Sequence, residues 1–389
     1  MVILFFLLIV LVAFSLSKSN SPAKDGMLLT TFFLCLLFYN WVSAVYILSI
    51  ATVVYFGLAR KHQLPPFFQR HLLSLINIFI LATLFGLKYV VDKLGLFNQL
   101  NATLSTIGFT YLALRLLQYA NSCFHQRIQT HTYFQFLLFV FFLPIFLAGP
   151  IQPFDTFYSK RKAPVSNREQ TASWLRVAIG LIKVFALPAL LSFMTGGYTP
   201  ASIAQIFDHE LGVLTMTKVW GALFFCTLYF YLNFSGYCDI AIGASKLLGF
   251  TIVENFDSPL LSTNLLLFWQ RWHISLGVWC REFVFYPLSR LVKSAALGAL
   301  LTFMLIGLWH GFGLHWLLFG FWHGIGVVSV VVFQRQGFKF TNKLVLSKFI
   351  GWLLTMLYVS AGTLFALMAE YGDLRQTFKV LGIAFGFVR

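Results

Sequence analysis

Long apolar runs cover most of the chain, and short polar segments rich in Lys and Arg separate them. The runs lie at about 1–17, 27–59, 72–91, 102–119, 133–149, 172–194, 216–234, 237–250, 262–291, 295–310, 313–333, 346–369 and 376–388. A helix rises about 1.5 Å per residue, so roughly 20 apolar residues cross a membrane. The pattern predicts an all-α polytopic membrane protein of about ten crossing helices. We expect one domain over residues 1–389.

The run at 27–59 is longer than one crossing requires, and Asn40-Trp41 interrupts it. This predicts a broken hairpin of two short helices, about 27–39 and 41–59. Such a hairpin returns the chain to the cytoplasmic side, where the basic residues that follow, such as Arg60, would lie.

Other segments are too short or too polar to cross. Residues 133–149 end in Ala148-Gly149-Pro150 and precede the basic run Lys160–Lys162, which predicts a re-entrant segment. Residues 195–215 carry acidic but no basic side chains and suit an external loop, whereas 334–348 suit a cytoplasmic one. The first run has no basic leader, so we expect a retained helix.

Composition agrees with a membrane protein. Of the 389 residues, 59% are hydrophobic and 10% are charged, whereas soluble proteins carry about 25% charged residues. This excludes a soluble enzyme and a nucleic-acid-binding domain. The net charge of +16 fits basic cytoplasmic loops. The five cysteines form no CxxC motif and read as buried apolar residues.

Polar residues in membrane segments are costly and therefore suggest function. They concentrate in residues 233–326. In the first group, Asn233–Gly243, we expect Gly236 to break a helix. Asp239 then either binds a partner at depth or caps a helix start.

The second group spans residues 254–283. Glu254–Ser262 reads as a loop into a helix with Ser262 or Thr263 as its N-cap. The tryptophans that follow indicate an interfacial or re-entrant helix with Arg271 and Ser275 on one face. His273 on this helix is either functional or a hydrogen-bonded structural residue.

The third group, Gly307–Gly326, holds His310, His315 and His323 among apolar residues, with Trp-His-Gly at 309–311 and 322–324. A buried neutral imidazole can act as a general base. The histidine spacing does not match a HExxH motif, so we expect no metal site. Sequence patterns of a covalent nucleophile, a P-loop or a dinucleotide fold are absent from the chain.

Taken in order, several segments resemble the membrane-bound O-acyltransferase (MBOAT) family, and its bacterial polysaccharide-modifying branch in particular. They are Phe38–Trp41, Ile107–Tyr111, Ala148–Ile151, Asn233–Gly243, Glu254–Pro259, Phe268–Leu276, Leu308–Gly311 and Trp322–Gly324. The resemblance implies a ring of helices around a catalytic tunnel. It also implies that His310 is the base and that His273 assists by orienting a substrate. The further predicted substrate-binding residues are Trp269, Arg271, Trp272, Asp239, Asn255 and His323.

Some positions depart from the family pattern. Gln270 stands where the family usually has Arg, and Asn233 replaces the usual Asp. The Gly-Gly-Asn-Arg loop of the alginate branch is missing between Tyr286 and Gly307. These differences affect the prediction of the substrate more than that of the reaction.

The resemblance implies a multi-pass O-acyltransferase of the bacterial inner membrane, with acetyl as the expected acyl group. It implies no tightly bound cofactor and a cytoplasmic thioester donor, acetyl-CoA or an acyl carrier protein. The expected partners are membrane lipid, an exported polysaccharide or cell-wall glycan, and an external partner acyltransferase. D-alanyl transfer to teichoic acid and peptidoglycan O-acetylation are alternatives. A transporter or flippase without covalent chemistry is an alternative of another class.

Overall fold

The computed structural model describes residues 22–83, 109–128, 130–146, 148–160, 165–336, 345–369 and 372–388. Some of the expectations fall on residues outside these ranges. They concern the run at 1–17, residues 84–108, Arg161, Lys162 and the middle of 334–348. The described part is helical and contains no strand, apart from one isolated antiparallel bridge between Phe256 and Trp272. The all-α prediction is confirmed.

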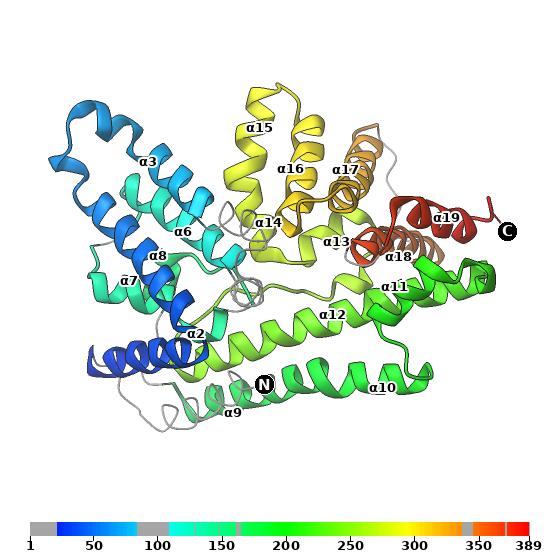
Figure 1. Cartoon of the computed structure of the whole chain (residues 1–389), viewed down its shortest axis with the longest axis horizontal. Coiled ribbons are helices and arrows are strands. Elements are labelled where there is room, and N and C mark those ends of the chain that lie inside the picture. The colour runs from blue at the N-terminus through cyan, green and yellow to red at the C-terminus, as the bar shows by residue number, and fades with distance from the viewer. Residues whose placement is uncertain are drawn as a thin grey trace. The chain divides into compact units, whose positions relative to one another are not determined.

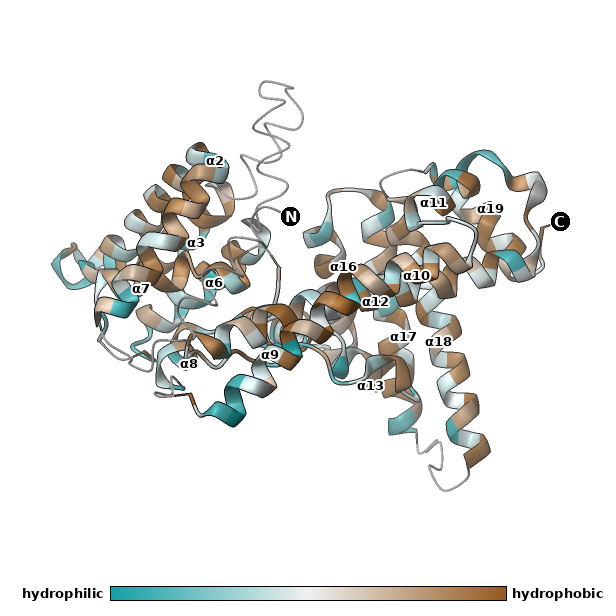
Figure 2. Cartoon of the chain, turned by 90° about the horizontal axis from the view of Figure 1, so that it is seen from below, coloured by the Kyte–Doolittle hydropathy of each residue, from teal (hydrophilic) through white to brown (hydrophobic). Residues whose placement is uncertain are grey.

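Five helices of the described part are long and apolar enough to cross a membrane, which confirms the polytopic prediction. They are Ala23–Ala59, Asn167–Met194, Met216–Leu247, Leu314–Arg335 and Val345–Met368. Two shorter apolar helices are Pro66–Leu81 and Ala295–His310. Hydrophobic colouring runs along these helices in Figure 2, and hydrophilic colouring marks ends such as the start of α9. The number of ten crossings stays a prediction.

Contacts divide the chain into two compact units. Unit 1 comprises residues 1–180 and 237–254, and unit 2 comprises residues 181–236 and 255–389. The continuous helix α12 (Met216–Leu247) contributes to both. The expectation of a single domain over 1–389 stays a prediction.

Unit 1 contains the N-terminal helices and the buried segment around Pro150. Its helices are α2 (Pro22–Ala59), α3 (Pro66–Leu81), α6 (Phe109–Phe124), α7 (Tyr133–Val140), α8 (Phe154–Ser159), most of α9 (Asn167–Leu181) and the end of α12, with the short turns η1 (Lys61–Gln63) and η3 (Leu143–Ile145).

Asn40 interrupts α2 where the sequence predicts a break. Its backbone is extended (φ −160°, ψ 96°), so two helices meet at this residue. Its side-chain oxygen accepts a hydrogen bond from the backbone N–H of Ser43 at 2.9 Å. Asn40 therefore caps the second helix, as a short amide side chain can. Figure 1 shows the two halves of α2 running in different directions.

Residues 133–149 begin with the short helix α7, and their re-entrant path stays a prediction. A capping box of Thr132 and Gln135 starts α7, which has only 8 residues. The aromatic residues after it and the Pro150 turn are buried. The guanidinium of the buried Arg115 donates to the carbonyl oxygen of Phe139 near the end of this helix. A basic group there satisfies a helix-terminal carbonyl.

Unit 2 contains the C-terminal helices and the predicted histidine motifs. Its elements are η4 (Ile182–Ala186), α10 (Leu187–Met194), α11 (Pro200–His209), η5 (Leu211–Val213), the first part of α12, η6 (Pro259–Leu261), α13 (Leu265–Arg271), α14 (Ile274–Cys280), η7 (Arg281–Phe285), α15 (Tyr286–Leu291), α16 (Ala295–His310), α17 (Leu314–Arg335), α18 (Val345–Met368) and α19 (Leu374–Ala384). Helices α15, α16 and α17 lie side by side in Figure 1.

Two local predictions are wrong. Gly236 does not break α12, because an interior glycine keeps its backbone hydrogen bond and costs only about 1 kcal/mol relative to alanine. Asn264, and not Ser262 or Thr263, caps α13, and its side chain accepts from the N–H of Leu267 at 2.8 Å. Residues 195–215 contain the short helix α11, which Thr199 caps, and their external position stays a prediction.

Candidate functional site

His273 lies at a sharp break between α13 and α14. Its backbone is in the left-handed region (φ 48°, ψ 53°), which is unusual for a residue with a side chain. This conformation costs about 1–2 kcal/mol. The predicted shared helix face of Arg271 and Ser275 is therefore wrong, because the helix ends between them.

Backbone pairing with residues 255–257 holds this break in place. The N–H of Asp257 donates to the carbonyl oxygen of Arg271 at 3.0 Å, and the N–H of Ile274 donates to that of Asn255 at 2.9 Å. Two segments that are distant in sequence thus fix the backbone on both sides of His273. A strained conformation held by its surroundings is frequent at functional sites.

Asn255 is fully buried and orients the His273 ring. Its Oδ1 accepts hydrogen bonds from the backbone N–H and the hydroxyl of Ser275, at 3.1 and 2.8 Å. The Nδ1 of His273 lies 3.1 Å from the same oxygen. An amide oxygen only accepts, so Nδ1 carries the proton and Nε2 keeps its lone pair.

His310 is the last residue of α16, directly beside α17. The helices approach closely because Gly307 and Gly320 have no side chain: a Cβ at either position would collide with the backbone of the opposite helix. The His310 ring stacks on Trp316 of α17, with ring centres 5.1 Å apart and planes inclined by 23°. Its side chain is exposed to the cavity that it lines.

His323, in the second Trp-His-Gly element, is buried among aromatic rings. Its ring centre lies 4.9 Å from that of Trp269 and 4.6 Å from that of Phe319. Among the described residues, its Nδ1 has no hydrogen-bond partner. Gly362 allows this packing, because a Cβ there would crowd the imidazole.

All three histidines line one cavity of about 510 Å³ in unit 2. Its walls are largely aromatic and aliphatic, with a few hydroxyl groups. The lining residues are Thr199, Pro200, Ala201, Thr227, Tyr229, Phe230, Phe234, Phe268, Trp269, Trp272, His273, Leu276, Ile306, His310, Trp316, Phe319, His323, Val359, Thr363, Ala366 and Leu367. We call it the histidine cavity. Its volume is typical of a small-molecule site.

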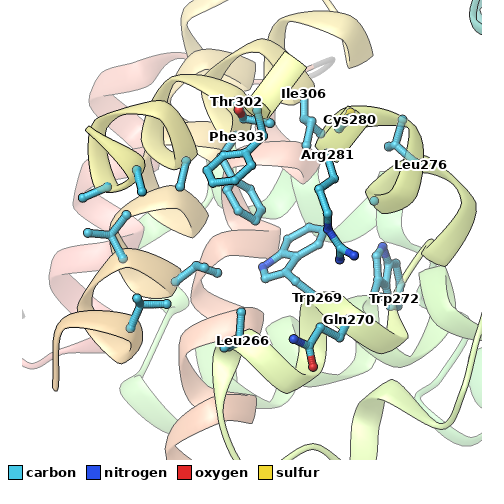
Figure 3. A pocket seen from close by; sticks show the side chains of 18 of the residues that line it. Leu266, Trp269, Gln270, Trp272, Leu276, Cys280, Arg281, Thr302, Phe303 and Ile306 are labelled. Carbon is cyan, nitrogen blue, oxygen red and sulfur yellow. The ribbon is translucent and has the colours of Figure 1, made fainter. Parts of the chain in front are cut away.

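A second cavity of about 310 Å³ lies on the other side of the same wall, and we call it the arginine cavity. The two cavities share Trp269, Trp272, His273, Leu276 and Ile306. The arginine cavity adds the cations Arg281 and Arg335 and a mostly apolar lining. In the view of Figure 3, Arg281 reaches down between Trp269 and Trp272.

Most predicted site residues of unit 2 come together here. His310, His273, Trp269, Trp272 and His323 line the histidine cavity, and Asn255 binds His273. Arg271 lines neither cavity. It lies 3.9 Å from a carboxylate oxygen of Asp257, with the side chains 32% and 71% exposed.

Asp239 has a different environment. It lies in unit 1, in the interior of α12, so the expectation that it caps a helix start is wrong. Its carboxylate accepts from Nε of Arg176 at 3.0 Å, as expected for an acid at depth. Arg176 also donates to both carboxylate oxygens of Glu254 at 2.6 Å. Our sequence reasoning missed Arg176, although a lone arginine in the apolar run at 172–194 is a signal.

The sequence reasoning also did not assign Trp316, Phe319, Arg281 or Arg335 to the site. In the sequence, Trp316 and Phe319 look like ordinary aromatic residues of a membrane helix. Their role is visible only in the structure, where α17 lies beside His310. In the described ranges, no group of three His, Cys, Asp or Glu side chains is positioned to hold a metal ion.

Comparison with known proteins identifies the family. The model of the family "MBOAT, membrane-bound O-acyltransferase family" matches residues 26–368. The chain is 29% identical over 225 residues to a teichoic acid D-alanyltransferase of Bacillus subtilis, covering 54% of each chain.

Two further relatives carry other names. A probable alginate O-acetylase AlgI of Pseudomonas aeruginosa is 32% identical over 188 residues, covering 47% of this chain and 34% of the relative. A peptidoglycan O-acetyltransferase of Helicobacter pylori is 29% identical over 184 residues, covering 46% and 34%. The alignments thus cover between a third and about half of these relatives. Since the family model matches most of the sequence, the chain belongs to the membrane-bound O-acyltransferase family.

Proposed function

We propose that this protein transfers an acyl group, with acetyl as the first group to test, from a cytoplasmic thioester to a hydroxyl acceptor outside the membrane. The observation that carries the proposal is the shared wall: His273 lines both cavities, and His310 is exposed in one of them. Two substrates can therefore approach one wall from two sides. Family membership supports the reaction class.

The proposed chemistry is a direct transfer. The neutral imidazole of His310 takes the proton of the acceptor hydroxyl while the oxygen attacks the thioester carbonyl carbon. A C–O bond forms, the C–S bond breaks, and the proton passes to the departing thiolate. The products are an ester and a free thiol. His273, with Nδ1 held by Asn255, orients a substrate through Nε2.

The arginine cavity suits the donor. Both arginine side chains are exposed and line its wall. Arginine binds phosphate through paired charge-assisted hydrogen bonds. Coenzyme A and the phosphopantetheine arm of a carrier protein both carry phosphate and place the thioester at the far end of an uncharged arm. We propose one of these as the donor and no tightly bound cofactor.

The histidine cavity suits the acceptor. Named relatives act on alginate, teichoic acid or peptidoglycan, so a polysaccharide or cell-wall polymer at the outer face of a bacterial inner membrane is the proposed acceptor class. D-alanyl transfer and peptidoglycan O-acetylation stay alternatives within this class. An external partner acyltransferase could relay the acyl group to the polymer.

The test supplies labelled acetyl-CoA to membranes that contain the full chain and the host envelope. His310→Ala should reduce labelling of the envelope by at least about 100-fold, since general base catalysis contributes about 10²–10⁴-fold. His315→Ala is the matched control: His315 lines neither cavity and contacts the Thr377 hydroxyl at 3.0 Å. Equal labelling with wild type and His310→Ala would refute the role of His310.

A further inference from the structure

The two cavities differ in charge. Among the described residues, no Lys, Arg, Asp or Glu lines the histidine cavity, although the chain has a net charge of +16. Its ionisable side chains are the three histidines and Tyr229. The arginine cavity, across the shared wall, carries two permanent cations. Permanent charge is thus confined to one side of the wall.

A charged acceptor would be poorly stabilised in the histidine cavity. Moving a carboxylate or phosphate out of water costs several kcal/mol unless an opposite charge compensates it. Histidine could compensate only when protonated. A histidine that acts as base must be neutral when the acceptor binds.

The polar groups that do line the cavity are neutral. They include the hydroxyl groups of Thr199, Tyr229 and Thr363. A hydroxyl group both donates and accepts, so such side chains can pair with a hydroxyl group of a ligand. The surrounding aromatic rings offer apolar surface to the carbon face of a ring-shaped ligand.

We propose that the group that enters the histidine cavity is uncharged, and specifically a hydroxyl-bearing neutral sugar residue. A uronate or a phosphodiester unit is disfavoured there. This inference rests on the proposed function and narrows its acceptor class. In the step itself, the sugar oxygen forms the new ester bond, its proton leaves through His310, and the thiol departs on the donor side.

The test uses two acceptors, of which one is charged and the other is neutral. Purified full-length protein in lipid nanodiscs receives labelled acetyl-CoA and either oligomannuronate or its methyl ester, which has the same ring hydroxyls. We expect kcat/KM to be at least about tenfold higher for the ester. The positive net charge of the chain attracts the free acid at long range, so assays at low and high salt separate this attraction from cavity preference. Equal or better use of the free acid at high salt would overturn the inference.

A variant pair provides an independent check. Ala201 lines the cavity on α11, so Ala201→Arg places a cation there, and Ala201→Gln adds a neutral side chain. Ala201→Arg should raise the acid-to-ester ratio at least about tenfold over Ala201→Gln. Identical ratios in the two variants would count against the inference.

The two proposals fail in different ways. Cleavage of the thioester that depends on His310, without transfer to either oligosaccharide, would overturn the neutral-sugar inference and leave the proposed function standing. Absence of any His310-dependent cleavage, with these acceptors and with glycerol, would overturn the proposed function itself.

Discussion

Nδ1 of His273 lies 3.1 Å from Oδ1 of Asn255, although the two residues are 18 positions apart and both are buried. The same oxygen accepts from two groups of Ser275. One amide oxygen therefore determines the tautomer of the histidine and anchors the start of α14. His273 belongs to the lining that the two cavities share, and its other ring nitrogen, Nε2, is buried there.

Replacing Asn255 should damage folding and transfer together. Asn255→Leu keeps the approximate size but leaves the buried donors of Ser275 and His273 without their acceptor. An unsatisfied buried donor costs about 1–3 kcal/mol. We expect a clear fall in the thermal unfolding midpoint and at least a tenfold loss of transfer. Ser275→Ala removes one donor and keeps the acceptor, so its loss should be smaller. Equal losses would contradict this account.

The left-handed backbone of His273 predicts which substitutions fold. Asparagine and glycine adopt this conformation readily, whereas a β-branched residue does not. His273→Asn should give folded protein at the wild-type yield with at least tenfold lower transfer. His273→Val should give little monodisperse protein by size-exclusion chromatography. If the valine variant were as well folded as the asparagine variant, the backbone argument would be wrong.

The close approach of α16 and α17 predicts a contrast between two glycines. Gly307→Ala would push a methyl group against the carbonyl of Trp316, at an expected cost of about 1–3 kcal/mol. Gly221→Ala, in helix α12, meets no atom within 4 Å and should stabilise by about 0.5–1 kcal/mol. The thermal unfolding midpoints of the two variants, compared with wild type, test this contrast. The same shift in both would show that helix spacing is not limiting.

Arg281 should act on the donor through its phosphates. Arg281→Ala should raise KM for acetyl-CoA by at least about tenfold, because a charge-assisted hydrogen bond contributes about 1.5–3 kcal/mol. KM for the N-acetylcysteamine thioester of acetate, which has no phosphate, should stay unchanged. A parallel rise in both values would place Arg281 in a structural role instead.

The sequence predicted those features whose cause is local. Asn40 interrupts an apolar run and caps the helix that follows, so both signals lie within four residues. The histidine motifs were also visible, since polar side chains are conspicuous in apolar sequence. The structure brings them to one cavity.

The features that sequence reasoning missed depend on distant partners. Nothing between Phe268 and Leu276 signals a helix break, because residues 255–257 impose it through backbone pairing. Arg176 contacts carboxylates 63 and 78 positions away, and no local pattern reports such pairing. The prediction at Gly236 was wrong for the opposite reason. A glycine is a local signal for a helix break, yet α12 continues through it.

The shared wall limits how this protein can evolve. A mutation at Trp269, Trp272, His273, Leu276 or Ile306 alters the surroundings of both cavities at once. A substitution at these positions that favours a new ligand in one cavity therefore also changes ligand binding in the other cavity. Independent change is open to residues that belong to one cavity alone, such as Ala201 or Arg335. Divergence among descendants should therefore accumulate first at those unshared positions.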